Sequence, residues 1–211
     1  KKKPTTIPEK VEPQKRIEFS SKPTTQTDEE GIPTLASRIK NAFPSSNGLY
    51  PHEILMLDYA SSYKTSGNSF QNFWKWNYSV LDPQRILDSL FERGFICRGD
   101  AASALKRCVV ADLKAMLSQK GAKATGKKEE LISRILETYS TQELEQTLPD
   151  RHYALTELGE QELKENEYVS YLHRHHYMSV WEMNIMLHIN NPSHLRYRDI
   201  IWRELNKQSG E

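Results

Sequence analysis

A short basic loop holds the residues of this chain that are best placed to bind a charged ligand. Glycines bracket the loop at Gly121 and Gly126, and Lys123, Lys127 and Lys128 lie in it or directly after it. A helix that begins beside these lysines would add backbone N–H groups and the positive end of its dipole. Together these features predict a site for an anion, and the anion most often bound in this way is a nucleic-acid phosphate.

Two short amphipathic helices must position this loop. The first has apolar residues at helical spacing along one face: Val110, Leu113, Met116 and Leu117. The second repeats the pattern at Leu131, Ile132 and Ile135. The spacing therefore predicts a helix–loop–helix hairpin in which the apolar faces pack together and the basic loop faces solvent.

The charge of the chain is concentrated at this hairpin. The 211 residues carry a net charge of +1, so affinity for nucleic acid must come from a local patch. Between Leu105 and Leu136 the basic residues are Lys106, Arg107, Lys114, Lys120, Lys123, Lys127, Lys128 and Arg134. The acidic residues of the same stretch are Asp112, Glu129 and Glu130, whereas residues 137–166 are rich in acids.

The hairpin resembles the SAP motif, a helix–extended loop–helix module. The matching residues are Leu113, Lys114, Leu117, Gly121, Gly126, Lys128, Leu131, Ile132, Arg134 and Ile135. Ala122 departs from the pattern, because the family more often has a larger apolar residue there. The resemblance implies binding to duplex DNA with a preference for composition or shape. The alternatives are a structural hairpin with a solvated loop, or a module that binds RNA or protein.

The resemblance also selects the residues expected to contact DNA. Lys114, Lys123, Lys127 and Lys128 would bind phosphates, together with the backbone N–H groups from Gly126 to Lys128. Arg107 and Lys120 would flank the contact. Arg134 would support the module or reach a neighbouring phosphate.

A second pattern flanks the SAP-like segment. Asp82-Pro83 predicts the start of a helix that Gly94 ends, with Ile86, Leu87, Leu90 and Phe91 as its buried stripe. Thr156 predicts the cap of a later helix. These parts resemble a winged-helix domain whose hairpin strands are Phe95–Arg98 and His152–Leu155. The SAP-like module would then be inserted at the wing.

Other groups of residues could in principle form a functional site, but the sequence gives them less support. The histidines His173, His175 and His176 have no nearby Cys and no HExxH spacing, so a polar helix surface or a partly buried histidine is favoured over zinc. The aromatic run from Phe70 to Tyr78 is favoured as core over a base-stacking platform. Cys97 and Cys108 fit no metal or disulfide pattern. No catalytic motif and no cofactor motif is present, which favours a protein that is not an enzyme.

These observations predict a mainly α (α+β) protein with four parts. Residues 1–32 form a disordered basic linker, 33–100 and 150–166 a winged-helix-like domain, 104–140 the SAP-like module, and 167–211 a helical C-terminal segment. The candidate core positions of the C-terminal segment are Val180, Met183, Leu187, Leu195, Ile200 or Ile201, Trp202 and Leu205. The segment is either part of the same core or a docking unit.

The predicted function is non-enzymatic binding of duplex DNA without a cofactor. The alternative is an assembly or adaptor protein that uses its aromatic and C-terminal surfaces for a protein partner or a second copy. The overall character of the sequence resembles bacterial, phage or mobile-element proteins. No apolar run is long enough for a membrane span, so a cytoplasmic location is expected, with the nucleoid or a virion as alternatives.

Overall fold

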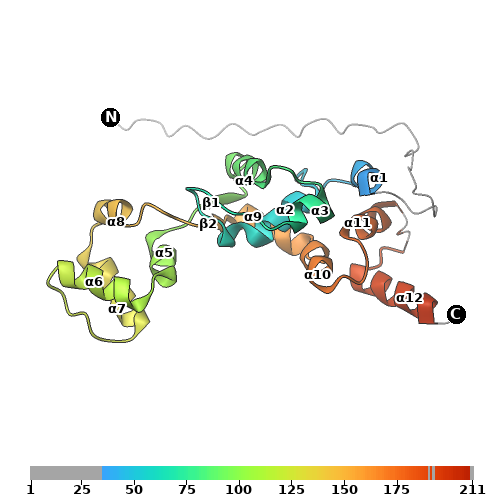
Figure 1. Ribbon diagram of the computed structural model, residues 1–211. Helices are drawn as coiled ribbons and strands as arrows, with labels where there is room; N and C mark the ends of the chain where they lie inside the picture. The colour runs from blue at the N-terminus through green and yellow to red at the C-terminus, as the bar shows by residue number, and fades with distance from the viewer. Residues whose placement is uncertain (1–34, 190, 192, 210–211) are drawn as a thin grey trace, which may run out of the picture.

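The computed structural model describes residues 35–189, 191 and 193–209, and this part of the chain is mainly helical with one two-stranded antiparallel sheet (Figure 1). The N-terminal half contains α1 (Leu35–Lys40), α2 (Pro51–Tyr59), the 3₁₀ turn η1 (Ala60–Ser62), α3 (Phe73–Tyr78), α4 (Pro83–Glu92), β1 (Ile96–Arg98) and α5 (Ala101–Arg107). The remainder contains α6 (Val110–Gln119), α7 (Lys128–Thr138), α8 (Thr141–Thr147), β2 (Tyr153–Leu155), α9 (Glu157–Glu165), α10 (Tyr168–His175), α11 (Val180–Ile189) and α12 (Tyr197–Ser209). The predicted linker at residues 1–32 lies outside the described residues. Among the described residues, no helix is both long and apolar enough to cross a bilayer.

The sheet joins two strands that are far apart in the sequence. β1 and β2 pair antiparallel, with Ile96 opposite Leu155 and Arg98 opposite Tyr153. The Gly99 N–H extends the pairing by donating to the His152 carbonyl at 2.8 Å. The predicted pairing of these two strands is confirmed, and α5 to α8 lie between them in the chain. The winged-helix topology itself stays a prediction.

All elements outside α5–α8 share one hydrophobic core, and we call them the body. Its largest buried side chains include Trp74 and Trp181, which come from α3 and α11. The C-terminal helices α10, α11 and α12 contribute Tyr168, Met183 and Ile200, respectively, to the same core. Of the two alternatives for this segment, the structure therefore favours membership of the common core.

The four helices α5–α8 enclose a second, smaller core, and we call them the hairpin unit. Figure 1 shows this unit at one end of the molecule and α12 at the other. Its core is formed by Leu105, Leu113, Met116, Leu117, Leu131, Ile132, Ile135, Tyr139 and Leu144. Leu105 and Leu144 come from α5 and α8, so both outer helices help to cover the hairpin.

Local sequence signals fix the helices that flank the sheet. The Asp82 carboxylate accepts the Arg85 N–H at 3.3 Å, and Gly94 follows α4 with a φ of +77°. The Thr156 hydroxyl accepts the Gly159 N–H at 3.2 Å and donates to the Gly94 carbonyl at 2.7 Å. The predicted helix caps are confirmed, and the second of them ties α9 to the end of α4.

Close contact between α9 and β1 requires a glycine. A Cβ atom on Gly159 would lie 2.1 Å from the Phe95 carbonyl oxygen, far inside van der Waals contact. The absence of a side chain therefore lets α9 lie directly against the chain that enters β1.

Four predicted core positions are wrong. Val110, Phe91, Trp202 and Leu205 are exposed, by 40%, 48%, 69% and 38% respectively. Phe91 only meets the ring of Tyr153 edge-on, with the centroids 6.2 Å apart. Each of the four residues lies at the border of an apolar stripe, and the helix turns that border toward water.

The aromatic run is core, as favoured from the sequence. Trp74 and Tyr78 are buried, and the Trp74 indole N–H donates to the Tyr63 hydroxyl at 2.9 Å. Trp76 is the exception, because it is exposed and stacks beneath the Lys75 ammonium group.

His173 is part of this aromatic core. Its Nε2 and Nδ1 atoms lie 3.1 Å and 3.0 Å from the hydroxyl oxygens of Tyr59 and Tyr78. Both ring nitrogens are thus engaged by tyrosines. Within the described residues, no group of three or more His, Cys, Asp or Glu side chains is arranged to hold a metal ion.

Candidate nucleic-acid interface

The basic loop is held between two helices that pack closely. Leu117 of α6 and Ile135 of α7 are fully buried between them. The Tyr139 hydroxyl, just after α7, donates to the Met116 carbonyl at 2.7 Å and joins the two helix ends. The predicted hairpin is confirmed in this arrangement, with residues 120–127 as its loop.

Two glycines and one arginine shape the loop. Gly121 and Gly126 have φ values of +66° and +131°, which L side chains rarely adopt. Arg134 of α7 donates through Nη1 to the carbonyls of Lys123 at 2.5 Å and Thr125 at 3.1 Å. The Arg134 guanidinium therefore fastens the loop to α7, which agrees with the supporting role expected for it.

The start of α7 differs from the expectation of free N–H groups. The Lys127 N–H donates to the Glu130 carboxylate at 3.3 Å. That carboxylate crowds Gly126 so closely that a Cβ there would lie 2.3 Å from its oxygen. Since Glu129 also lies in the first turn, the helix dipole is already balanced by acids of its own. An anion at this site would therefore be bound mainly by side-chain cations.

Four lysines supply those cations. Lys114, Lys123 and Lys127 are exposed and Lys128 is half-buried. Among the described residues, none of the four forms an ion pair with a carboxylate, in contrast to many cations of the body. Their positive charge is thus available to a ligand that approaches the loop and the start of α7.

Lys120 is placed differently. Its ammonium group pairs with the Glu143 carboxylate of α8 and lies 4.9 Å from the centre of the Tyr139 ring. The hydrogen bond from Lys120, with those from Ser140, lowers the pKa of Glu143 to about 2, so the carboxylate is charged at neutral pH. Lys120 is therefore partly neutralised within the unit, which its position in the sequence did not indicate.

The hydrogen bonds of two acids to the helix starts beside this surface were not predicted from the sequence, although a signal for them exists. Glu130 lies three residues after Lys127, and Glu143 lies three residues after Ser140. At this spacing the carboxylate of an acid in the first turn can accept a hydrogen bond from the backbone N–H of the N-cap residue, and both carboxylates do so.

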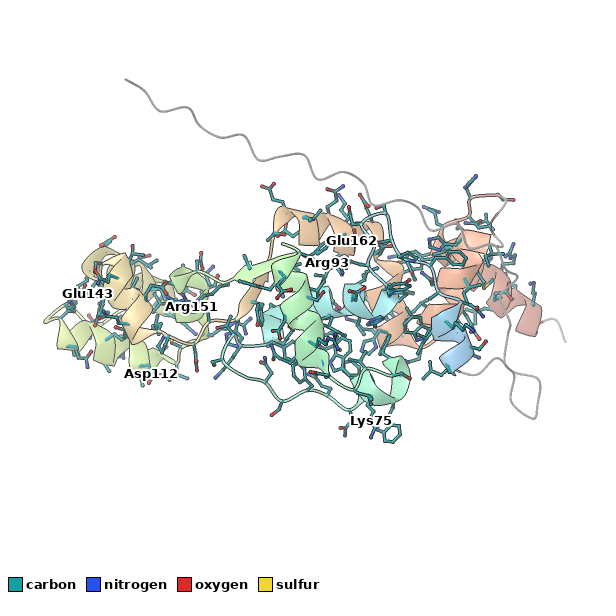
Figure 2. All side chains as sticks on the ribbon, turned by 90° about the horizontal axis from the view of Figure 1, so that it is seen from above. Lys75, Arg93, Asp112, Glu143, Arg151 and Glu162 are labelled. Atoms are coloured by element: carbon teal, nitrogen blue, oxygen red, sulfur yellow. The ribbon has the colours of Figure 1, made fainter. Side chains whose placement is uncertain are left out.

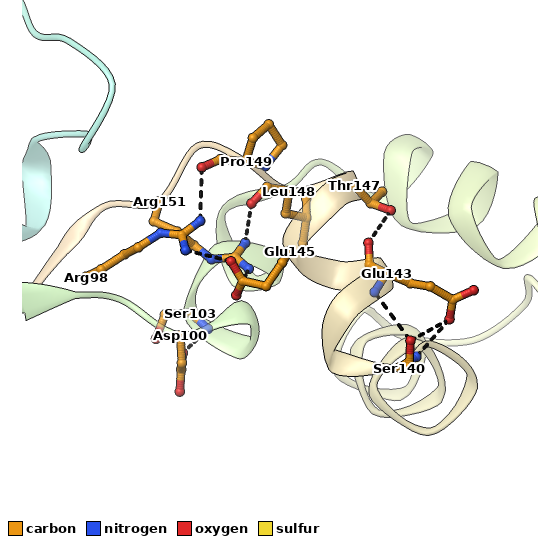
Figure 3. A network of polar contacts seen from close by, with 10 residues as sticks. All are labelled: Arg98, Asp100, Ser103, Ser140, Glu143, Glu145, Thr147, Leu148, Pro149 and Arg151. Carbon is orange, nitrogen blue, oxygen red and sulfur yellow. Dashed lines mark hydrogen bonds and ion pairs between the residues drawn. The ribbon is translucent and has the colours of Figure 1, made fainter.

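A network of polar contacts sets the hairpin unit against the sheet (Figure 3). The Glu145 carboxylate of α8 pairs with Arg98 at 2.6 Å and with Arg151 at 2.9 Å. Arg151 is only 1% exposed and also donates to the Leu148 carbonyl at 2.6 Å. Since Arg98 and Arg151 lie on the two connections between body and unit, Glu145 ties both connections to α8. Figure 2 places Arg151 at this junction, with Asp112 and Glu143 on the hairpin unit and Lys75 on the body.

Comparison with known proteins identifies one segment. The family model of the SAP domain matches residues 109–140, which covers α6, the basic loop and α7. Neither the curated proteins nor the solved structures contain a match to the chain. The match agrees with the helix–loop–helix geometry described above, with the buried positions Leu113, Leu117, Leu131 and Ile135 and with the two loop glycines. Residues 109–140 are therefore a SAP domain.

Proposed function

We propose that this protein is a non-enzymatic, duplex-DNA-binding protein that contacts phosphates through its SAP domain. The SAP domain suggests nucleic-acid binding in general. The observation that carries the proposal is a group of four lysines on or beside the loop of that domain that have no ion-pair partner within the described part of the chain: Lys114, Lys123, Lys127 and Lys128. Arg134 supports the shape of the loop, and Lys120 and Arg107 lie at its flanks.

The proposed contacts predict how binding depends on conditions. Lysine ammonium groups contact phosphates without recognising bases, so sequence preference should be weak. Each neutralised phosphate contributes about 0.9 to the slope of log affinity against log salt. Four lysines therefore predict a slope of about −3.6 from this surface alone.

A fluorescence-anisotropy titration with a labelled duplex of about 20 base pairs, at several salt concentrations, tests the proposal. The wild-type chain should bind, with affinity that falls steeply as salt rises. The variant Lys127→Glu/Lys128→Glu should lose measurable binding while its circular dichroism spectrum stays unchanged.

The matched control is Lys40→Glu/Lys75→Glu, which makes the same change of charge at two exposed lysines of the body. It should bind nearly as well as the wild type. Equal affinity of the Lys127/Lys128 variant and this control would contradict the assignment of the site.

We propose the winged-helix arrangement as the finer description of the body. The supporting observations are the helix α4, its glycine stop, the antiparallel pair β1 and β2, and α9 capped by Thr156. The SAP domain then lies in the chain where the wing hairpin would be. A solved structure of the full chain in which α4 does not pack beside the pair β1 and β2 would reject this description.

An adaptor role is the second candidate, because large apolar side chains remain exposed on the body. Trp76 is 68% exposed, and Trp202 of α12 is exposed to a similar degree. Exposed tryptophans are favoured at protein interfaces. Light scattering of the full chain over a range of concentrations tests self-assembly. A mass that stays that of one chain would exclude a homo-oligomer.

A further inference from the structure

A second group of basic residues lies where the hairpin unit meets the body. Arg107 ends α5 and donates from Nη2 to the Ser61 carbonyl of the body at 2.5 Å. This bond holds the guanidinium beside η1 and the turn that follows it. Lys64, in that turn, forms an isolated antiparallel bridge with His152, which directly precedes β2. Arg107, Lys64 and His152 thus come together from three distant parts of the chain.

The electrostatic environment supports this grouping. Burial lowers the pKa of His152, and the positive charges of Arg107 and Lys64 lower it further, against the opposing charge of Asp150. Both cations therefore act on the same imidazole. The charge of Asp150 offsets only part of this, because its carboxylate is 3.7 Å from the Lys64 ammonium and both groups are about half exposed.

The group also connects to the SAP domain. Burial and Asp112 raise the pKa of the Cys108 thiol, and Lys128 at the start of α7 opposes them. The helix α5, which ends at Arg107, also packs against α7, which begins at Lys128. The cations Lys128, Arg107 and Lys64 consequently lead from the SAP domain across the end of α5 onto the body.

We propose that the duplex-binding surface extends beyond the SAP domain along this line, with Arg107 and Lys64 binding further phosphates of the same DNA. The inference rests on the proposed function and names a part of the surface outside residues 109–140. A line of separate cations suits a row of phosphates better than a compact anion. The guanidinium has five N–H donors, and the bond to Ser61 uses one nitrogen, so others can still donate to a phosphate.

The Glu145 carboxylate of α8 supports a continuous surface, because it links the hairpin unit to the body. It contacts Arg98 and Arg151 on both connections, and these contacts favour one orientation of the unit against the body. Cations on the two parts are then arranged before DNA arrives, and little ordering entropy is lost on binding.

The test uses the full chain, the same labelled duplex and a series of salt concentrations. The variant Lys64→Gln/Arg107→Gln should bind with a log–log salt slope that is shallower by about 2, since each lost phosphate contact removes about 0.9. Lys40→Gln/Lys75→Gln is the matched control and should keep the wild-type slope. The single change Lys64→Gln, which leaves the Arg107–Ser61 bond in place, should remove about 1.

Two further outcomes separate the hypotheses. The charge-preserving variant Lys64→Arg/Arg107→Lys should keep the slope, which a purely structural role of these side chains would not require. A wild-type slope in both Lys64→Gln and the double glutamine variant would overturn the extended surface while leaving the SAP-domain contact in place. If the wild-type chain itself does not bind the duplex, the proposed function fails first.

Discussion

The hairpin unit and the body are stabilised by different kinds of contact. All the core residues of the hairpin unit lie between Leu105 and Leu144, and nearly all are aliphatic. The body depends on contacts between distant parts of the chain. The Asn184 side chain, for example, accepts the Phe43 N–H at 2.7 Å, and Asn47 donates to the buried Glu162 carboxylate at 2.7 Å. A family pattern can therefore be contained in the short segment of the unit, whereas the body has no comparable local signature.

The two regions also use their polar groups differently. In the body, Glu162, Asn184 and Ser37 are buried. In the hairpin unit most charged side chains are exposed, and four lysines of the SAP domain form no ion pair with any residue that the structure describes. Polar side chains thus contribute to packing in the body, whereas the four lysines of the unit remain available for a ligand. The predictions that follow test this separation.

The largest effect is expected from a cavity in the small core. Leu117→Ala removes a fully buried side chain and should cost about 2–5 kcal/mol of stability. Because the unit has so few core residues, we expect it to unfold and duplex binding to be lost. All four tryptophans lie in the body, so the unfolding transition seen by tryptophan fluorescence should hardly move. Ser118→Ala, at an exposed neighbouring position, is the control. If Leu117→Ala shifts the tryptophan-detected unfolding of the body together with the unfolding of the hairpin unit, the two regions fold as one.

The converse change disturbs the body. Gly159→Ala places a methyl group against the Phe95 carbonyl and should destabilise the body by about 1–3 kcal/mol. Urea unfolding followed by tryptophan fluorescence measures this, and DNA affinity below the transition should remain. The exposed Gln161→Ala should shift the transition by less than about 0.5 kcal/mol. An unchanged transition in Gly159→Ala would contradict the close contact between α9 and β1.

A smaller effect is expected where the two regions meet. Glu145→Gln removes the carboxylate that both Arg98 and Arg151 contact, and leaves the buried Arg151 without a charged partner. Both regions should still fold, but hydrogen exchange at the Gly99 amide should become faster because the junction opens more often. Glu137→Gln, an exposed acid on α7, serves as the control. Equal exchange rates in the two variants would show that Glu145 does not hold the junction.

The smallest effect concerns pH. Burial lowers the pKa of His52 and His173 in the body, whereas residues 101–147 contain no histidine. A lowered folded-state pKa means that the unfolded chain takes up protons first. The body should thus be most stable above pH 6.5 and lose stability as the pH falls below that value. In the hairpin unit the Lys120–Glu143 contribution should be lost only between about pH 4.5 and 2.

Urea titrations at several pH values, with tryptophan fluorescence for the body and the Tyr139 signal in NMR spectra for the unit, check this order. If, as the pH falls, the hairpin unit loses stability at a higher pH than the body does, the predicted order is contradicted.

The features predicted correctly from the sequence are those determined by neighbouring residues. The caps at Asp82 and Thr156 join residues three positions apart. The hairpin and the loop contacts of Arg134 are contained in one short segment, where Arg134 reaches carbonyls nine and eleven residues away. Apolar spacing also located the buried faces of α4, α6 and α7. It placed Val110 and Phe91 inside because periodicity gives the centre of a buried stripe more accurately than its border.

The features that were missed depend on distant partners. Nothing near Lys120 in the sequence indicates that Glu143 of another helix neutralises it, and nothing near Arg107 indicates the Ser61 carbonyl. Trp202 was predicted as a core position, but the buried side chains of α12 are those of Tyr197, Ile200 and Ile201. The fold, and not the sequence pattern, thus determines which lysines are paired with a carboxylate and which are available to a ligand.

The hydrogen bond from Gly99 to His152 brings the entry and exit of the whole hairpin unit to neighbouring positions on one sheet. The hairpin unit therefore forms one long loop between two neighbouring positions of the body, with the Arg107–Ser61 and Arg98–Glu145 contacts in addition. Closing such a long loop costs more entropy than closing a short turn. A two-residue turn grafted between β1 and β2 should consequently leave the body folded, and the same two positions could accept another domain in place of this one.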